Sequence, residues 1–140
     1  MLLVHVVWAT LRRRPLLQPS FDHILVAIIG KKARDLDCVL LAAGCGSDHV
    51  HSLLRLAPSA RLADLVQRIK GGSAYDANHQ ARVPEPIHWQ AGYWAESLGP
   101  GDFEPLADYV RSQRIRHDPS HPAERWQFDD DWEPALLGGL

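Results

Sequence analysis

The sequence has few cysteines, no long apolar run and no leader-like start, and each shortage excludes a class of protein. Its 140 residues include two cysteines, too few for a disulfide framework, so we expect a reduced, cytosolic protein. No apolar run approaches the ~20 residues that a membrane-spanning helix needs. The first nine residues lack the basic segment that opens a signal peptide, so none is expected. The remaining composition, 46% hydrophobic and 23% charged, is that of an ordinary globular domain.

The formal net charge of −2 hides an uneven distribution. Residues 1–72 hold ten Lys and Arg against five Asp and Glu, whereas residues 73–140 hold five against twelve. Local fields, rather than the total charge, steer a polyanion to its site. The basic first half therefore leaves a nucleic-acid partner open.

Hydrophobic periodicity predicts an alternating order of strands and helices. Strands are predicted at 2–9, 38–43, 49–56 and 87–95, and helices at 20–34, 58–71 and 102–117. Ser20 is the predicted N-cap of the first helix, and Gly71-Gly72 the end of the second, followed by a loop over 73–86. This order predicts an α+β, ferredoxin-like βαββαβ antiparallel sheet with an additional C-terminal helix. Residues 1–117 are predicted to form one domain, and residues 118–140 an acidic tail.

Two histidines on one predicted strand suggest a metal site. His49 and His51 are two residues apart, so both imidazoles leave the same face of a strand, while Val50 turns the other way into a core. Imidazole is the commonest nitrogen ligand for divalent transition metals. Asp48 is either a carboxylate that orients His49 or a turn residue before the strand. Two histidines do not complete a coordination sphere, so further ligands are expected elsewhere.

The last predicted helix carries Tyr109 and Gln113, four residues apart and so on one face. A Gln oxygen can join two imidazoles as a ligand, and tyrosine is a known covalent nucleophile. Spacing alone favours a core role for Tyr109 and leaves a metal site of unknown use.

Five short blocks, spread over residues 2–117, carry a resemblance. They are His5–Thr10 with the arginines after it, Asp48–Leu56, Leu62–Gly71, Trp89–Tyr93 and Asp108–Gln113. In this order and at these separations they resemble the small single-tyrosine HUH transposases of the insertion-sequence and REP-associated families. The chain departs from the family pattern at Trp94–Ser97, which brings a bulky ring and an acid near the site, and after Gln113, where many relatives have paired histidines.

The resemblance implies a reaction and assigns residues to it. It makes His49, His51 and Gln113 the ligands of a divalent metal, Mg²⁺ or Mn²⁺, and Tyr109 the nucleophile. The enzyme would nick and rejoin single-stranded DNA bearing hairpins through a 5′-phosphotyrosine intermediate. The likeness also implies a homodimer with active sites shared between subunits, in the bacterial cytoplasm and on the nucleoid when bound to DNA.

Other side chains receive supporting roles. His5 and His88 are assigned to packing or to the strand surface, and Lys70 to the exposed side of its helix. Two rival interpretations stay open: a DNA-binding relative that has lost the chemistry, and an unrelated ferredoxin-like metal-binding or assembly domain. As a group, the expected phosphate contacts are Arg12, Arg13, Arg14, Arg55, Arg61, Lys70 and Arg111.

Overall fold

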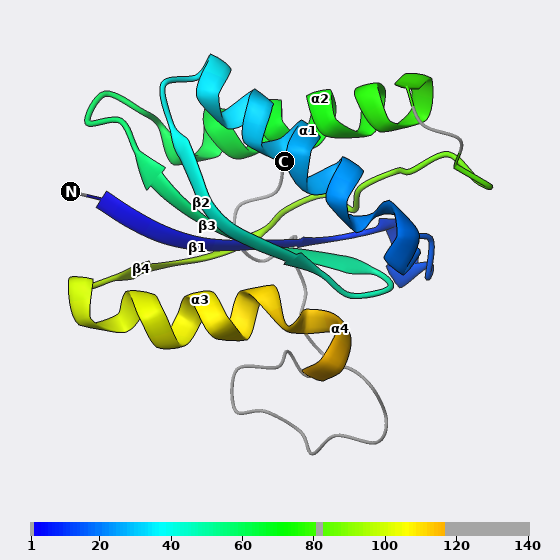
Figure 1. The fold of residues 1–140 in the computed structure, drawn as a ribbon. Helices are drawn as coiled ribbons and strands as arrows, with labels where there is room; N and C mark the ends of the chain where they lie inside the picture. The colour runs from blue at the N-terminus through cyan, green and yellow to red at the C-terminus, as the bar shows by residue number, and fades with distance from the viewer. Residues whose placement is uncertain (1, 81–82, 117–140) are drawn as a thin grey trace.

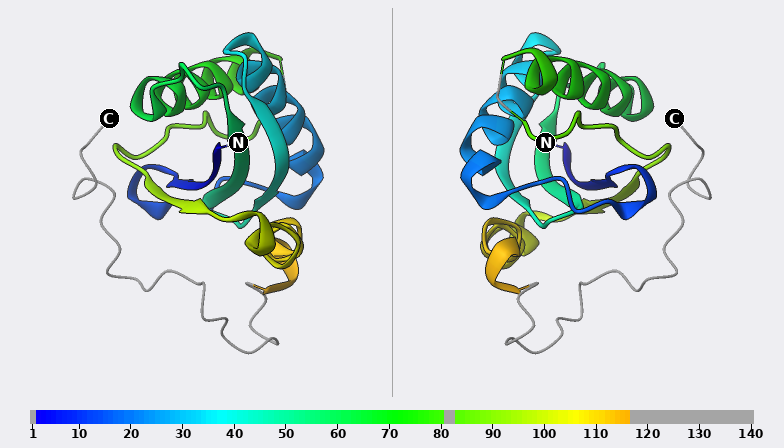
Figure 2. Two further views of the ribbon diagram at one scale, coloured as in Figure 1. Left: turned by 90° about the vertical axis from the view of Figure 1, so that its left-hand side faces the viewer. Right: turned by 90° about the vertical axis from the view of Figure 1, so that its right-hand side faces the viewer.

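The computed structural model of the protein describes residues 2–80 and 83–116. Strands β1 (Leu2–Ala9), β2 (Val39–Cys45), β3 (His49–Leu56) and β4 (Trp94–Leu98) form one antiparallel sheet in the order β2-β3-β1-β4. Helices α1 (Asp22–Asp35) and α2 (Leu62–Gln80) cover one face of this sheet (Figure 1). The opposite face carries α3 (Phe103–Arg111) and the short α4 (Gln113–Arg116), as Figure 2 also shows. The predicted α+β, ferredoxin-like fold is therefore confirmed, while the predicted acidic tail lies outside the described residues.

Alternation along the strands decides which side chains meet which helices. On β1, Val4, Val6 and Trp8 join the apolar core beneath α1 and α2. His5 and Val7 lie on the opposite face, paired with Leu53 and His51 of β3. Central position in the sheet buries both faces of β1, and its residues from Leu3 to Ala9 are all buried.

The main core lies between the sheet and the helices α1 and α2. It is mainly aliphatic and includes buried Leu25 and Ile29 from α1 and Val66 and Ile69 from α2. A smaller apolar cluster lies under α3 and consists of Ala42, Leu53, Ala107, Tyr109 and Val110. Among the described residues, no helix is both long and apolar enough to cross a membrane.

Helix α2 does not end at Gly71-Gly72, as predicted, but continues to Gln80, so the expected loop from Ser73 is wrong. Gly72, but not Gly71, lies against a residue of α1. A Cβ on Gly72 would lie 3.0 Å from Cδ and Cε of Lys32, whose Nζ pairs with Asp76 at 2.9 Å. A close helix–helix contact, rather than a helix end, explains the small residue at position 72.

The fourth strand begins later than predicted, at Trp94, because residues 87–93 are held by other contacts. The only bridge from Trp89 joins it to Thr10, within the described residues. Lys70 Nζ donates to the carbonyls of Gln90 and Gly92, and Gly92 has a left-handed φ of 84°. The left-handed backbone at Gly92 interrupts the extended conformation, so the strand begins only after it.

Further boundaries differ from prediction, among them the start of α2, at Leu62 rather than 58. Helix α1 starts at Asp22, after a 3₁₀ turn over Pro19–Phe21, and Ser20 makes no cap hydrogen bond. Strand β2 spans Val39–Cys45 rather than 38–43. The last predicted helix is broken after Arg111, where Ser112 leaves helical geometry and its hydroxyl donates to the carbonyl of Asp108. Short 3₁₀ turns also occur at Leu11–Arg13 and Pro100–Asp102.

Candidate active site

His49 and His51 project from the same face of β3, as their spacing predicts. Their ring centroids are 5.1 Å apart, and both rings are buried under the end of α3. Val50, between them, belongs to the core on the opposite face, which confirms the predicted alternation.

Tyr109 and Gln113 come to this pair from the end of α3 and the start of α4. Gln113 is fully buried, and its Oε1 lies 3.4 Å from Nε2 of His49. The ring of Tyr109 meets the ring of His51 edge-on, with centroids 5.5 Å apart. The structure therefore brings together the four residues that the sequence singled out, all within one chain.

Two glycines near the β2–β3 turn make room for this arrangement. A Cβ on Gly44 would lie 1.7 Å from the carbonyl oxygen of Val110, so any side chain there would push α3 off the sheet. A Cβ on Gly46 would lie 2.3 Å from Cε1 of His49. The sequence suggested only turn chemistry for this segment; their role in helix and ring placement depends on contacts distant in the chain.

Asp48 orients the ring of His49. Its Oδ1 lies 2.7 Å from Nδ1 of His49, and its Oδ2 accepts a hydrogen bond of 3.0 Å from Nε of Arg13. Burial alone would raise the pKa of Asp48, but the hydrogen bonds and charges of His49 and Arg13 outweigh it and lower the pKa to about 2. An ionised carboxylate only accepts hydrogen bonds, so neutral His49 carries its proton on Nδ1 and a lone pair on Nε2.

His5 stands behind His51. Its Nε2 lies 2.9 Å from Nδ1 of His51, the two rings are stacked at 26°, and only 2% of His5 is exposed. Burial lowers the pKa of His5 to about 4, so the ring is neutral at pH 7. The sequence assigned His5 to packing or surface; its contact with a site residue depends on strand register, which the sequence alone does not reveal.

The amide of Gln113 has one defined orientation. Its Nε2 donates to the carbonyl of Tyr109 at 3.0 Å, so Oε1 is the atom that faces His49. Two lone-pair atoms, His49 Nε2 and Gln113 Oε1, therefore face one another at 3.4 Å. Such a pair is stabilised by a cation or a proton between them.

The donor set fits a divalent cation. Two ligand atoms at ~2.1 Å from one octahedral ion lie about 3 Å apart when they subtend a right angle, close to the separation seen here. Imidazole nitrogen and amide oxygen both suit Mn²⁺, and amide oxygen suits Mg²⁺. Over residues 2–80 and 83–116, no three His, Cys, Asp or Glu side chains gather into a metal-binding group, and Gln113 Oε1, 3.4 Å from Nε2 of His49, would supply the third protein ligand.

Arg114, which the sequence did not single out for the site, anchors α4 beside it. Its guanidinium forms a bidentate ion pair with Asp22 of α1, at 2.7 and 3.0 Å, and also donates to the carbonyl of Leu17 at 2.8 Å. Because Arg114 follows Gln113 directly, this anchor also fixes the position of the Gln113 backbone.

The predicted phosphate contacts do not form one cluster. Arg12 and Arg14 are exposed in the turn after β1, whereas Arg13 is partly buried on Asp48. Arg12 and Arg13 both have left-handed φ values, 56° and 55°, a strained geometry for residues with a side chain. Arg14 pairs with Glu85.

The other predicted contacts are more dispersed. Arg55 is exposed six residues along β3 from His49, roughly 20 Å away at ~3.3 Å per residue. Arg61, just before α2, and Arg111, at the end of α3, are also exposed. Lys70, expected on an exposed face, is instead buried, with its Nζ on the carbonyls of Gln90 and Gly92 at 2.7 and 2.8 Å. Burial lowers the pKa of Lys70 to about 8. The prediction that Lys70 is exposed is wrong, and its donors serve the fold.

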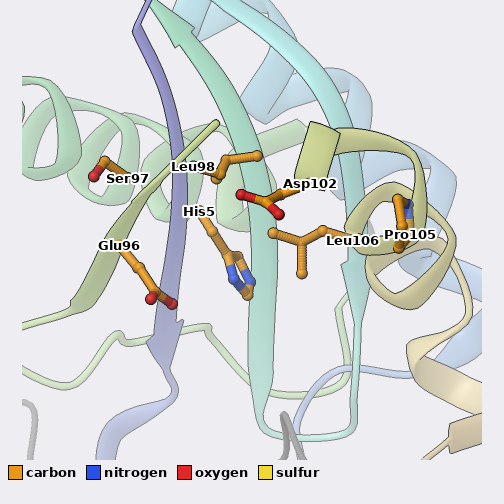
Figure 3. Close-up of a pocket in the computed structure, with 7 residues that line it drawn as sticks. All are labelled: His5, Glu96, Ser97, Leu98, Asp102, Pro105 and Leu106. Atoms are coloured by element: carbon orange, nitrogen blue, oxygen red, sulfur yellow. The ribbon is translucent and has the colours of Figure 1, made fainter. Parts of the chain in front are cut away.

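A cavity of about 290 Å³ adjoins the histidines on the α3 side of the sheet. His5 projects into it from β1, with Glu96 of β4 and Leu106 of α3 on either side (Figure 3). Asp102, just before α3, adds a second carboxylate to the lining. The cavity thus meets the histidine group through His5.

Comparisons with known proteins find transposases. The chain is 25% identical over 116 residues to the transposase for insertion sequence element IS200 of Salmonella typhimurium, covering 78% of this chain and 74% of that protein. The corresponding Salmonella typhi transposase matches to the same extent.

Two solved structures share the fold. The crystal structure of a candidate transposase from Deinococcus radiodurans has a TM-score of 0.60 and 25% identity, covering 80% of this chain and 90% of that one. A REP-associated tyrosine transposase bound to a REP hairpin also has a TM-score of 0.60, with 20% identity, covering 83% of this chain and 67% of that one. The family described as "Transposase IS200 like" matches residues 1–113, and the chain therefore belongs to the IS200-like transposase family.

Proposed function

We propose that this transposase nicks and rejoins single-stranded DNA, with Tyr109 as nucleophile and a divalent metal held by His49, His51 and Gln113. The observation that carries the proposal is the meeting of these four side chains in one buried group, with Gln113 Oε1 facing His49 Nε2. Burial of polar side chains raises the free energy of the folded protein unless they have partners. Two acceptors that face one another favour a cation between them.

The proposed reaction needs a nucleophile next to the metal, and the ring of Tyr109 contacts the ring of His51, a proposed ligand. The Tyr109 oxygen attacks a backbone phosphorus, a new P–O bond forms to the protein, and the bond from phosphorus to the 3′ oxygen of the preceding nucleotide breaks. The phenol loses its proton and the departing 3′ oxygen gains one. A bound divalent ion would draw charge from a non-bridging phosphate oxygen. Because the covalent intermediate keeps a phosphodiester, a 3′-hydroxyl can reverse the step without a nucleotide cofactor.

Access to Tyr109 requires a movement of α3. Tyr109 is only 2% exposed and packs with Ala42 and Leu53 of the sheet. A DNA phosphate therefore reaches its oxygen only when the helix shifts away from β2 and β3. The discontinuity at Ser112 provides a place where α3 can move while Arg114 keeps α4 attached to α1.

We further propose that the substrate is single-stranded DNA bearing a hairpin. The REP-associated structural neighbour is itself bound to a hairpin, and the exposed Arg12 and Arg14 lie in the turn that places Arg13 on Asp48. The expected homodimer with shared sites remains a prediction. In a single chain the four residues already meet. If two subunits exchanged α3, together with the α4 that follows it, each resulting site would contain the same four residues.

The test is covalent capture of DNA. The protein is incubated with Mg²⁺ or Mn²⁺ and labelled single-stranded oligonucleotides that carry its genomic flanking hairpins, and adducts are resolved under denaturing conditions. Wild type and Tyr75→Phe, a matched control because Tyr75 is exposed on α2, should form adducts, whereas Tyr109→Phe and chelator-treated wild type should form none. Adducts unaffected by Tyr109→Phe would contradict the nucleophile assignment. Hairpin binding without any cleavage would favour a DNA-binding relative that has lost the chemistry.

A further inference from the structure

His5 is buried, polar and attached to the site, yet the proposed reaction does not use it. It lies on β1 diagonally opposite His51, which pairs with Val7. The ring is fixed on two sides, stacked on His51 with centroids 5.1 Å apart and edge-on to Trp94 at 5.1 Å. Its Nε2 lies 2.9 Å from Nδ1 of His51.

One proton is shared across this nitrogen–nitrogen contact, and its position decides what His51 can bind. If His51 donates from Nδ1, its Nε2 carries a lone pair and can ligate a metal. If His5 donates instead, neutral His51 carries its proton on Nε2 and cannot ligate from that atom. The tautomer of His5 therefore sets the tautomer of His51.

The cavity that His5 lines fits the first arrangement. Its lining includes the carboxylates of Glu96, which pairs with His5 across β1 and β4, and of Asp102 (Figure 3). Carboxylates accept hydrogen bonds, directly or through water, so a proton on Nδ1, the His5 ring nitrogen not shared with His51, suits this lining and leaves Nε2 of His5 as acceptor. The same logic operates at His49, where Asp48 holds the proton on Nδ1.

We propose that His5 is a positioning residue, which accepts a hydrogen bond from Nδ1 of His51 and so keeps Nε2 of His51 unprotonated for the metal. The proposal rests on the proposed metal site and assigns a partner to each histidine: Asp48 to His49, and His5 to His51. A neutral imidazole in this position leaves less negative charge near the phosphate than a second carboxylate would.

Two substitutions separate positioning from packing. His5→Phe keeps a stacking ring and removes the acceptor, whereas His5→Gln retains an oxygen that can accept from His51. The tautomer of His51 is measured in metal-free, ¹⁵N-labelled protein at pH 7.5 from two-bond ¹H–¹⁵N correlations of the histidine rings. Mn²⁺ affinity is measured by titration calorimetry, and thermal unfolding without metal reports the fold.

We expect His51 to be protonated at Nδ1 in wild type and in His5→Gln, and to lose this preference in His5→Phe. Mn²⁺ affinity should fall by about 10- to 100-fold in His5→Phe and recover to within a few-fold in His5→Gln. If His5→Phe does not fold, His5→Asn, whose shorter side chain falls short of His51, replaces it in the comparison.

An unchanged His51 tautomer and unchanged Mn²⁺ affinity in His5→Phe would overturn the proposal, as would a wild-type His51 protonated at Nε2. Failure of wild type to bind Mn²⁺ at all would instead contradict the proposed metal site, and the tautomer spectra would still decide the role of His5.

Discussion

The two faces of the sheet differ in what they bury. Beneath α1 and α2 lies a broad aliphatic core, exemplified by Leu25, Leu54 and Ile69. Beneath α3 the apolar cluster is small, and much of the buried volume consists of polar rings and an amide: His5, His49, His51, Tyr109 and Gln113. Because burial of polar groups is unfavourable without partners, the second face depends on its hydrogen bonds. The face under α1 and α2 therefore holds most of the apolar core, and the face under α3 holds the polar candidate site.

Strand β3 has side chains on both faces of the sheet, so single substitutions on this strand test whether the two faces have separate roles. The largest expected effect on function comes from His51→Ala, which removes a proposed ligand. Mn²⁺ binding should weaken by at least ~100-fold and DNA adducts should be lost, while the protein still folds. Titration calorimetry and the adduct assay measure both, with thermal unfolding as the control. Near-normal Mn²⁺ affinity would remove His51 from the ligand set.

Leu54→Ala changes the other face of the same strand. Leu54 is fully buried in the main core, so truncation should lower the free energy of unfolding by about 2–5 kcal/mol. Chemical denaturation measures this loss. Mn²⁺ affinity of the folded variant should remain within a few-fold of wild type. A larger loss of affinity would show that the two faces are coupled rather than separate.

Asp48→Asn keeps the shape of the carboxylate and removes its charge. Mn²⁺ affinity should fall by about 10- to 100-fold, because the amide no longer fixes the proton of His49 on Nδ1. Adduct formation at saturating Mn²⁺ should recover, unlike in His51→Ala. Equal effects of the two substitutions would place Asp48 in direct contact with the metal or the DNA.

Asp48→Asn also tests how the stability of the protein depends on acid pH. The pKa of Asp48 is about 2 in the folded protein, below the ordinary value of 3.8, so the ionised carboxylate stabilises the fold above about pH 4. That stabilisation is lost as the pH falls toward 2. The difference in unfolding free energy between wild type and Asp48→Asn should therefore shrink from pH 5 to pH 2. A constant difference would show that the ion pair with Arg13 does not contribute through the charge of Asp48.

The smallest expected effect is that of Arg114→Gln, which loosens the attachment of α4 to α1. The Asp22 pair is partly exposed, so the unfolding free energy should change by ~1 kcal/mol or less. Mn²⁺ affinity should fall by a few-fold, because Gln113 is less firmly held. Asp22→Asn is the matched control and should act in the same direction. An effect of Arg114→Gln alone would show that the hydrogen bond of Arg114 to the carbonyl of Leu17, rather than the Asp22 ion pair, holds α4 in place.

Much of the fold was predictable because local pattern and tertiary structure agree. The bounds of β1 and β3 were predicted correctly, since apolar and β-branched residues fill both strands. Strand alternation likewise put His49 and His51 on one face and Val50 on the other. The meeting with Tyr109 and Gln113 was expected from the family resemblance, because helical spacing alone favoured a core role for Tyr109.

The features that the sequence did not predict have a common cause, which is contact between segments far apart in the chain. Gly72 permits the approach of Lys32 rather than ending a helix, and Lys70 is buried because residues 90–92 offer it carbonyls. His5 was assigned to packing or surface because its partner depends on the register between β1 and β3. None of these contacts has a local sequence pattern.

The central claim is that the face under α3 carries the reaction through Tyr109, and adduct mapping tests it most directly. The covalent DNA–protein complex is digested with protease and nuclease, and the modified peptide is identified by mass spectrometry. The chain has three tyrosines, at positions 75, 93 and 109, so the peptides are distinguishable. The account predicts a nucleotide linked through a 5′-phosphate to Tyr109 alone; a nucleotide on Tyr75, on Tyr93 or on a residue other than tyrosine would contradict it.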